Sequence, residues 1–226
     1  MKFFSQISLI LFTILLVFTG LRGELFSQNT TTYIPEEVSR LWIEGRSNIN
    51  EFECEANRYF GEAVLVQSED PIEFIQEANE RVYLQVEIDV DGFECGRSRM
   101  NRDLQEALKS SEFPEIIFLF DSAEFIGFVD DENENENDIF EVEVRGTLTV
   151  AGKTRDIHFV TRAYYLEPQR IRAIGKTSIK MSDFDVEPPT ALMGLIKADD
   201  ELTVNFDLVA SETEQLCQLC PHLQSQ

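Results

Sequence analysis

The chain has 226 residues, and its 42 acidic side chains outnumber the 19 basic ones to give a formal net charge of −23. A surface this acidic repels nucleic acids and anionic membranes, so neither is an expected partner. The length allows one large β domain or two small ones.

The first 23 residues are predicted to be an export signal. Lys2 supplies a positive charge, Ile7–Phe18 is a nearly unbroken apolar run, and Gly20 and Gly23 are small residues suited to cleavage. The apolar run is too short to span a membrane, so no stable membrane insertion is expected. Removal of residues 1–23 would leave a net charge of about −25 and place the mature protein in the periplasm or outside the cell.

The four cysteines of the chain fit such an oxidising compartment. Cys54 and Cys95 each follow a Phe-Glu dipeptide at the edge of a strand-like run, which favours a disulfide between them. This pairing leaves Cys217 and Cys220, although four cysteines allow three pairings and the sequence does not choose between them.

Strand-like alternation begins after a polar segment, residues 24–36, that is expected to be flexible. Glu37–Ser47 is the first predicted strand, Asn50–Val66 holds one or two more, and Arg81–Val90 alternates cleanly between apolar and polar side chains. Before this last strand, Pro71–Asn79 is expected to be a loop with a helical turn.

The apolar period then changes from two residues to that of a helix. Met100, Leu104 and Leu108 recur at helical spacing within Arg99–Lys109, and Asn101 is a candidate cap, so one short α-helix is predicted here. Glu115–Phe128 follows as a long aromatic strand.

A long hairpin is predicted in the second half of the chain. From Asp138 to Val150 apolar and polar side chains alternate, and Asp156–Ala163 returns as the next strand. Gly152 in the connecting turn supplies the left-handed backbone that a tight hairpin demands.

The remaining predicted strands are Arg170–Lys180 and Glu201–Val209, and residues 211–226 form a polar tail. The acidic run Asp130–Asp138 lacks the glycine and glutamate of an EF-hand loop, so it is predicted to be a solvated loop. About eight strands and one helix in hairpin order, without a βαβ pattern, predict one antiparallel all-β domain over residues 37–210, either a barrel or a sandwich.

Patterns for catalysis are weak. His158 lies between the inward-facing Ile157 and Phe159 and therefore points outward, and His222 lies in the tail. No spacing supports a nucleophilic triad or a two-histidine metal site, so neither enzymatic activity nor a cofactor is expected. The segment Cys217–Cys220 is compatible with a local disulfide, pairing to a partner, thiol redox chemistry or metal binding.

The predicted strands enclose many large aliphatic and aromatic side chains. An ordinary packed core is one interpretation, and an apolar tube that holds a long-chain ligand is the other. The composition does not separate the two.

Four sequence blocks, in order and at matching spacing, resemble the YceI-like family of exported lipid-binding or polyisoprenoid-binding proteins. The resemblance extends from about Tyr33 to Val209. The four blocks are Ser39–Ser47 with Asn50-x-Phe52, Gly96–Leu104 with Phe113–Phe118, Gly146–Arg155, and Ile179–Phe184 with Pro188-Pro189 and Gly194. The acidic insert and the cysteines depart from the family pattern and leave the identity of the ligand open.

The resemblance implies a lipocalin-like, antiparallel, eight-stranded β-barrel with one helix over part of it, and an isoprenoid or other long-chain amphiphile in its lumen. Candidate lumen residues follow from the inward phase of each strand. They are Ile43, Val86, Phe118, Phe120, Phe140, Val142, Val144, Phe159, Ile171, Val204 and Phe206.

Candidates for polar contacts at the mouth of the tube are Asp183, Arg97 and Arg99. The first functional hypothesis is therefore an exported, non-enzymatic carrier of a long-chain lipid. The alternatives are a structural or interaction module with a filled core, and a thiol-redox protein that uses Cys217 and Cys220.

Overall fold

The structure is a computed structural model that describes residues 30–66, 82–129, 139–191 and 195–213. These residues form twelve strands, one α-helix and two short 3₁₀ helices, which agrees with the predicted all-β class. In chain order they are β1 (Thr30–Pro35), β2 (Arg40–Ser47), β3 (Glu51–Ala56), β4 (Tyr59–Val66), β5 (Val82–Asp89), η2 (Val90–Gly92), β6 (Phe93–Glu94), α3 (Ser98–Ala107), β7 (Glu115–Val129), β8 (Ile139–Val150), β9 (Lys153–Glu167), β10 (Arg170–Lys180), η3 (Met181–Phe184), β11 (Thr190–Ala191) and β12 (Ile196–Thr213).

Several sequence predictions lie outside the described residues. They are the export signal over residues 1–23, the loop Pro71–Asn79, the acidic run Asp130–Asp138, and the cysteines Cys217 and Cys220.

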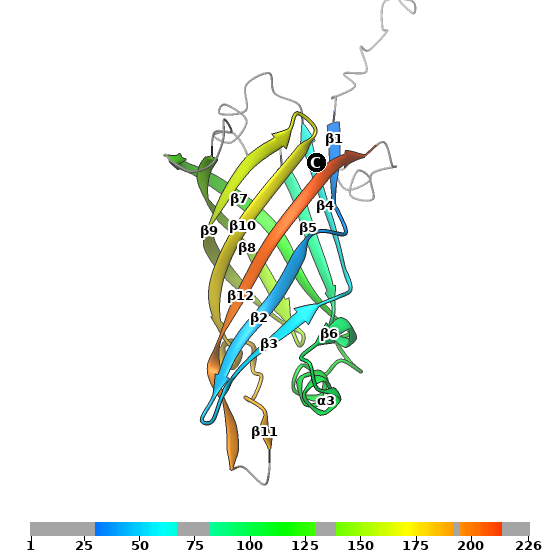
Figure 1. Cartoon of the computed structure of the whole chain (residues 1–226), viewed down its shortest axis with the longest axis vertical. Helices are drawn as coiled ribbons and strands as arrows, with labels where there is room; N and C mark the ends of the chain where they lie inside the picture. Colours follow the sequence, from blue (N-terminus) through cyan, green and yellow to red (C-terminus); the bar gives the residue numbers. More distant parts are fainter. Residues whose placement is uncertain (1–29, 67–81, 130–138, 192–194, 214–226) are drawn as a thin grey trace, which may run out of the picture.

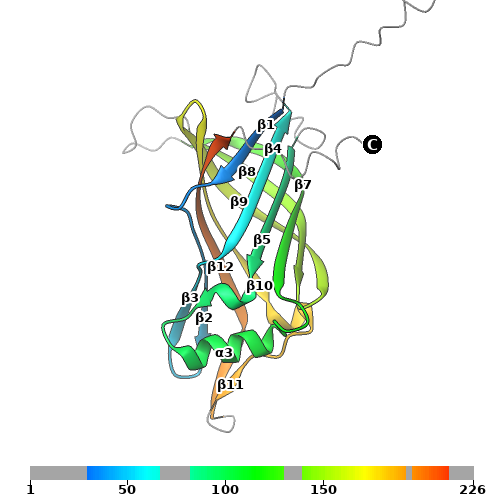
Figure 2. The same ribbon diagram turned by 90° about the vertical axis from the view of Figure 1, so that its right-hand side faces the viewer.

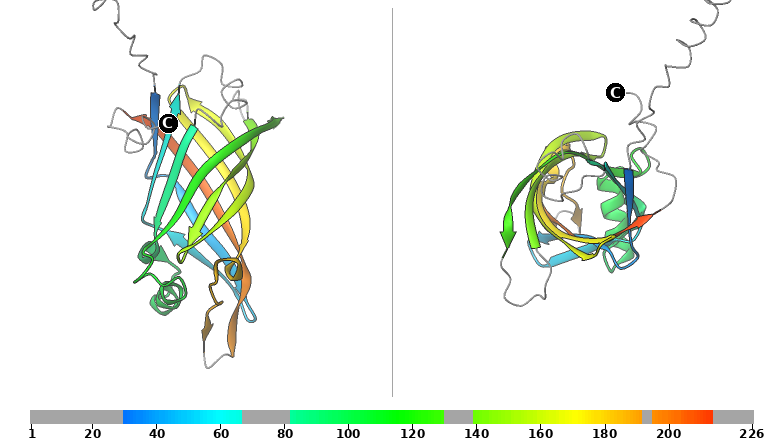
Figure 3. Two further views of the ribbon diagram at one scale, coloured as in Figure 1. Left: turned by 180° about the vertical axis from the view of Figure 1, so that it is seen from behind. Right: turned by 90° about the horizontal axis from the view of Figure 1, so that it is seen from above.

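Eight strands close into one antiparallel ring, in the order β1, β4, β5, β7, β8, β9, β10, β12 and back to β1 (Figures 1 and 3). Tyr33 of β1 marks the closure, because it pairs with Ala63 of β4 on one side and with Glu212 of β12 on the other. The predicted barrel is confirmed, and the sandwich is excluded.

Two strands, β1 and β2, pair with different parts of β12. The C-terminal end of β12 pairs with β1, whereas its middle pairs with β2, from Leu202 opposite Gly45 to Asp207 opposite Arg40. β2 pairs in turn with β3, and β3 with the short β6, so these strands form the wall near α3 (Figure 2). We call the end that carries α3 and η3 the helix end, and the opposite end, where β1 lies, the distal end.

Trp42, the one tryptophan of the chain, lies on the outside of this shared wall. It pairs with Asn205 of β12, the Arg40 guanidinium lies 4.8 Å from the centre of its ring, and its indole N–H donates a hydrogen bond of 3.0 Å to Glu44. The neighbouring Ile43 points inward and is buried, as strand alternation requires.

The long strands β7, β8 and β9 keep their apolar side chains on the inner face. The turn at Ala151 and Gly152 has φ values of +47° and +75°, which confirms the predicted tight hairpin. In β7 the register shifts near Asp121 and again near Ile126. Each shift adds one residue to β7, and the first one places Phe125 on the inner face opposite Val142.

The helix end is closed by α3, whose apolar side packs on the barrel core. Leu104 and the following Leu108 are buried there. A disulfide joins Cys54 of β3 to Cys95, just before the helix, with a Cα–Cα distance of 4.0 Å, which confirms this predicted pair. Asn101 does not cap the helix, because the chain enters it at Arg97 and the Asn101 amide oxygen instead accepts a 2.8 Å hydrogen bond from the backbone N–H of Cys95.

The N-terminal boundary of the domain differs from the prediction. Residues 24–36 were expected to be flexible, but Thr30–Pro35 form β1. Their partners in β4 and β12 lie far away in the sequence, so the local polar composition hid a strand that long-range pairing stabilises. For the same reason β12 runs on to Thr213, into the segment predicted to be a polar tail.

Candidate functional site

The inner face of the barrel carries all eleven candidate lumen residues. Directly opposite residues of an antiparallel pair point to the same side of the sheet, so the strand registers assign each residue to a face. The eleven residues belong to two apolar clusters, one at the helix end and one at the distal end. Ile43, Val86, Val204 and Phe206 lie in the cluster at the helix end, Phe120, Phe140, Val142, Val144, Phe159 and Ile171 lie in the distal cluster, and Phe118 packs against both. Their contact with a ligand stays a prediction.

The two clusters differ in how fully they are packed. At the helix end the inner side chains are mostly buried, among them Leu148, Leu202 and, under the barrel, Phe184. In the distal cluster Phe120, Phe125 and other large inner side chains remain partly exposed, although they lie inside a closed ring. Protein interiors are normally close-packed. The distal cluster thus combines buried side chains, such as Phe140 and Val142, with several large apolar side chains that remain partly exposed inside the ring.

Three phenylalanine rings mark the border between the clusters, and we call them the aromatic belt. Phe118 of β7, Phe159 of β9 and Phe206 of β12 form a chain of contacts, with ring-centre distances of 5.8 Å and 5.5 Å. Such tilted and edge-to-face arrangements are the favourable ones for aromatic pairs.

Glycines on the intervening strands make room for the belt. An added Cβ on Gly146 of β8 would lie 2.7 Å from the Phe118 ring, and one on Gly175 of β10 would lie 2.4 Å from the Phe206 ring. Side chains at these two positions would collide with the rings, so only glycine lets the rings lie against the backbone. Phenylalanine and glycine thus alternate over five neighbouring strands, from β7 to β12.

Polar groups gather on the inner face at the distal end. The registers place Tyr33 beside Glu212, and Tyr165 packs against the distal apolar cluster. Burial, and then the neighbouring Tyr165 and Glu212, raise the pKa of Tyr33, while burial raises the pKa of Tyr165. Both phenols are therefore protonated at neutral pH and can donate hydrogen bonds at this rim.

The polar residues predicted for the mouth lie elsewhere. Arg97, Arg99 and Asp183 are exposed at the helix end, where Arg99 forms an ion pair of 3.7 Å with Asp103 of the same helix. They do not join Tyr33 and Tyr165 at the distal rim, and their contact with a ligand stays a prediction. Strand alternation tells inside from outside but carries no information about which end of a barrel is covered.

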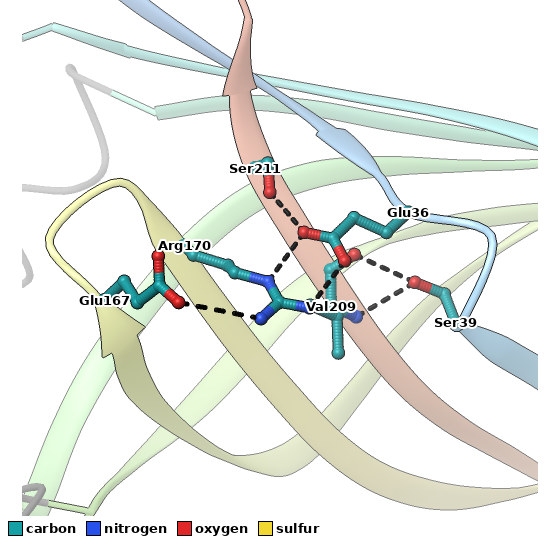
Figure 4. Close-up of polar contacts among 6 residues, drawn as sticks. All are labelled: Glu36, Ser39, Glu167, Arg170, Val209 and Ser211. Atoms are coloured by element: carbon teal, nitrogen blue, oxygen red, sulfur yellow. Dashed lines mark hydrogen bonds and ion pairs between the residues drawn. The ribbon is translucent and has the colours of Figure 1, made fainter.

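An ion pair on the outer surface anchors the segment that connects β1 to β2 (Figure 4). The Glu36 carboxylate accepts hydrogen bonds of 2.7 Å from two nitrogens of Arg170 in β10, and one from the Ser211 hydroxyl of β12. Beside it the Ser39 hydroxyl donates to the Val209 carbonyl and accepts from the Val209 N–H, both at 2.9 Å. The hydrogen bonds from Arg170 and Ser211 lower the pKa of Glu36 to about 2. This cluster fixes β1, and with it Tyr33, in the ring.

The part of the chain that the structure describes holds neither a metal-binding cluster nor a helix that could span a membrane. No group of three or more His, Cys, Asp or Glu side chains is arranged there to hold a metal ion. None of its helices is long and apolar enough to cross a membrane. His158 is exposed on the outer face, as predicted.

These features define a class of protein, a closed antiparallel barrel of lipocalin type with one covering helix and an apolar inner wall. The sequence profile of the YceI-like domain matches residues 44–210. The chain therefore belongs to the YceI-like family, as its sequence blocks indicated.

Solved structures show the same fold at low sequence identity. A polyisoprenoid-binding domain from Saccharophagus degradans, implicated in plant cell wall breakdown, is 14% identical, with a TM-score of 0.61 over 82% of this chain and 100% of that one. BcnA from Burkholderia cenocepacia is 19% identical, with a TM-score of 0.56 over 76% of this chain and 96% of that one. No curated protein sequence matches the chain.

The alternation of the belt phenylalanines with glycines on the intervening strands was not predicted from the sequence. The signal was present, because Gly146 and Gly175 occupy apolar-phase positions within long strands, where glycine is unfavourable unless another group approaches closely. The inward positions of Tyr33 and Tyr165 were not predicted from the sequence either, since the inward direction of a tyrosine near a strand end depends on ring closure.

Proposed function

We propose that the protein is a non-enzymatic carrier that holds an isoprenoid or other long-chain amphiphile in the distal half of its barrel. One observation carries this proposal: large apolar side chains, including Phe120 and Phe125, remain partly exposed inside a closed ring. Membership of the YceI-like family and the fold shared with a polyisoprenoid-binding domain support the same ligand class.

Affinity in such a site comes from burial of the ligand chain. Each buried methylene-sized group contributes about 0.8 kcal/mol, so one isoprene unit offers about 4 kcal/mol before costs. Loss of translational freedom and ordering of the chain consume much of this gain. In this proposal the phenol groups of Tyr33 and Tyr165, which lie on the inner face at the distal end, donate hydrogen bonds to the polar head of a ligand whose chain points inward.

Native mass spectrometry of the gently purified protein, with solvent extraction of anything bound, tests the proposal. We expect a discrete adduct whose extracted mass is that of an isoprenoid or fatty-chain lipid. A protein mass without adduct, unchanged after incubation with polyprenols and quinones, would instead support an interaction module with a filled core.

A pair of adjacent substitutions separates the two faces of one strand. Phe120→Glu places a charge on the inner wall, whereas Leu119→Glu places it on the outer face, where Leu119 is 44% exposed. We expect only the first to abolish uptake of a polyprenol. Thermal unfolding of both variants checks that they fold. If Phe120→Glu does not fold, Phe120→Ala replaces it in the uptake measurement.

We also propose that the protein is exported and works in the periplasm or outside the cell. The disulfide between Cys54 and Cys95 supports an oxidising compartment. N-terminal sequencing of the protein recovered from each cell fraction tests this. Cleavage near residue 23 in an extracytoplasmic fraction is the expected result, and an intact N-terminus confined to the cytosol would contradict it.

A further inference from the structure

Two tyrosine side chains on the inner face at the distal end have no hydrogen-bond partner. Tyr33 is only 8% exposed, and neither its phenol nor that of Tyr165 hydrogen-bonds to a described residue. On the outer face, by contrast, the phenol of Tyr164 accepts a hydrogen bond of 3.0 Å from Arg172. Among the described residues no fully buried side-chain polar atom is unpaired, so the two inner hydroxyl groups are still accessible. Because buried tyrosines usually bond through their hydroxyl, both phenols are available to a ligand.

The inner face of the distal half carries almost no charge. The arginines of β8, β9 and β10 in this region, Arg145, Arg162 and Arg172, lie at outward positions, where they form ion pairs with carboxylates. Among the described residues, the strand registers place no lysine, arginine or histidine on the inner face of this half. The one carboxylate that they place there is Glu212, which is exposed and directly opposite Tyr33. A ligand head at this end therefore meets hydrogen-bond donors and a negative charge, but no positive charge.

An anionic head group is a poor match for this surface. A phosphate or carboxylate loses hydration when it enters a partly buried site, and this cost is recovered where cations or several donors replace the water. Burial raises the pKa of Tyr33, and the negative charge of Glu212 adds to the shift, so this carboxylate already acts on the phenol. It would repel a second anion in the same way. An uncharged oxygen needs only a donor, which either phenol supplies.

We propose that the distal rim selects the ligand by the charge of its head group: it accepts an uncharged head with an acceptor oxygen, such as that of an alcohol, and rejects phosphate and carboxylate heads. Tyr33 and Tyr165 donate to the oxygen, and Glu212 repels the anions. This inference rests on the proposed carrier function, which supplies the apolar chain, and adds the chemical class of its head.

Two probes with the same chain and different heads measure this selection on the full-length protein. Geranylgeraniol has an uncharged head, and geranylgeranyl phosphate has an anionic one. Both are presented at neutral pH below their aggregation limits, and binding is followed by native mass spectrometry. The phosphate is expected to bind at least about tenfold more weakly than the alcohol.

The variant Glu212→Lys replaces the negative charge at the rim by a positive one. It is expected to strengthen binding of geranylgeranyl phosphate at least about fivefold and to leave binding of geranylgeraniol within about twofold of the unchanged protein. Glu124→Lys is the matched control, because it makes the same change of net charge on the outer face of β7, where the Glu124 side chain is 75% exposed. It should strengthen binding of the phosphate less than about twofold, since a distant exposed charge is screened by salt.

The variants Tyr33→Phe and Tyr165→Phe each remove one hydroxyl and keep the ring. Each is expected to weaken binding of geranylgeraniol about threefold, because one hydrogen bond to the head is lost. Tyr83→Phe is the matched control, since Tyr83 lies on the outer face of β5, opposite Val64 of β4, and its loss should leave binding unchanged. Thermal unfolding of the three variants checks that they fold.

The outcomes separate the two proposals. If neither probe binds to the unchanged protein, the carrier function is overturned together with the head-group rule. If the phosphate binds as tightly as the alcohol, the carrier stands and the rule is overturned. Equal responses of Glu212→Lys and Glu124→Lys, or of Tyr33→Phe, Tyr165→Phe and Tyr83→Phe, would also overturn the rule, because the rim would then not contact the head.

Discussion

The two halves of the barrel are built from the same strands, yet only the inner side chains at the helix end also pack against elements outside the barrel wall. β8 runs through both, with Phe140 and Val142 in the distal half and Leu148 and Val150 near the helix end, and its apolar alternation is the same throughout. The difference comes from what the inner side chains meet. Near the helix end they meet side chains of α3, η3 and the short β6, whereas the distal cluster is made only of side chains from the neighbouring strands β7 to β10.

The comparison shows that strand alternation defines an apolar wall but not what occupies the space beside it. At the helix end other parts of the chain pack against the inner wall, namely Leu104 and Leu108 of the α3 segment and Phe184 of η3. In the distal half no described helix performs that role. The four predictions below test this contrast, from the largest expected effect to the smallest.

Truncation of equivalent side chains should be far more costly at the helix end. Phe184→Ala, at a residue only 3% exposed, is expected to lower the free energy of unfolding by about 4 kcal/mol because it leaves a cavity in a packed core. Phe120→Ala in the partly exposed distal cluster is expected to cost about 1 kcal/mol. Urea unfolding of both variants measures the difference, and equal losses would mean that both halves are packed alike.

Loss of the disulfide should weaken the helix end selectively. Replacement of Cys54 and Cys95 by serine removes a link between positions 41 residues apart, and the expected loss of stability is about 3 kcal/mol. Hydrogen exchange read by mass spectrometry should show faster exchange in α3 and β3 than in β8 and β9. Uniform acceleration over all strands would show that the link stabilises the barrel as a whole.

A methyl group added beneath the belt should be costly, and one added away from it should not. Gly146→Ala would place its Cβ 2.3 Å from the Leu119 carbonyl oxygen, a backbone atom that has little freedom to move. A loss of about 2 kcal/mol in unfolding free energy is expected. At Gly127 an added Cβ meets nothing within 4 Å, so Gly127→Ala is the matched control and should be nearly neutral. Similar losses at the two sites would show that the close approach at Gly146 relaxes readily.

The smallest effect concerns pH and the ion pair between Glu36 and Arg170. Folding lowers the pKa of Glu36 from 4.5 to about 2, so its contribution to stability is complete above pH 4.5 and is lost as the pH falls from 4.5 towards 2. Stability of the unchanged protein and of Glu36→Gln, measured by urea unfolding across this range, should converge at the acid end. A constant difference between them would exclude the carboxylate as the titrating group.

Much of the fold could be predicted from the sequence because its information is local. Alternation with a period of two assigned all eleven candidate residues to the inner face, and the helical spacing of Met100, Leu104 and Leu108 located α3. The tight turn at Gly152 was equally local. Each of these features depends on residues only a few positions apart.

The features that escaped prediction depend on distant partners. β1 exists because Tyr33 pairs with strands on both sides, one of them at the far end of the chain. The covered end of the barrel is set by where α3 docks, so the sequence alone did not show that Arg97 and Asp183 lie at the helix end. The aromatic belt depends on rings from β7, β9 and β12 that meet only in the folded ring.

The outward position of Trp42 determines what optical spectroscopy can detect in this protein. The only indole chromophore lies on the outer wall near β12, between the Arg40 guanidinium and the Glu44 carboxylate, with the sheet between it and the lumen. Its emission should change strongly when the wall unfolds, and hardly at all when a saturated chain enters the barrel. A titration that shows no fluorescence change is therefore no sign of an empty tube, whereas a tryptophan introduced at Phe125, on the inner face, would report occupancy directly.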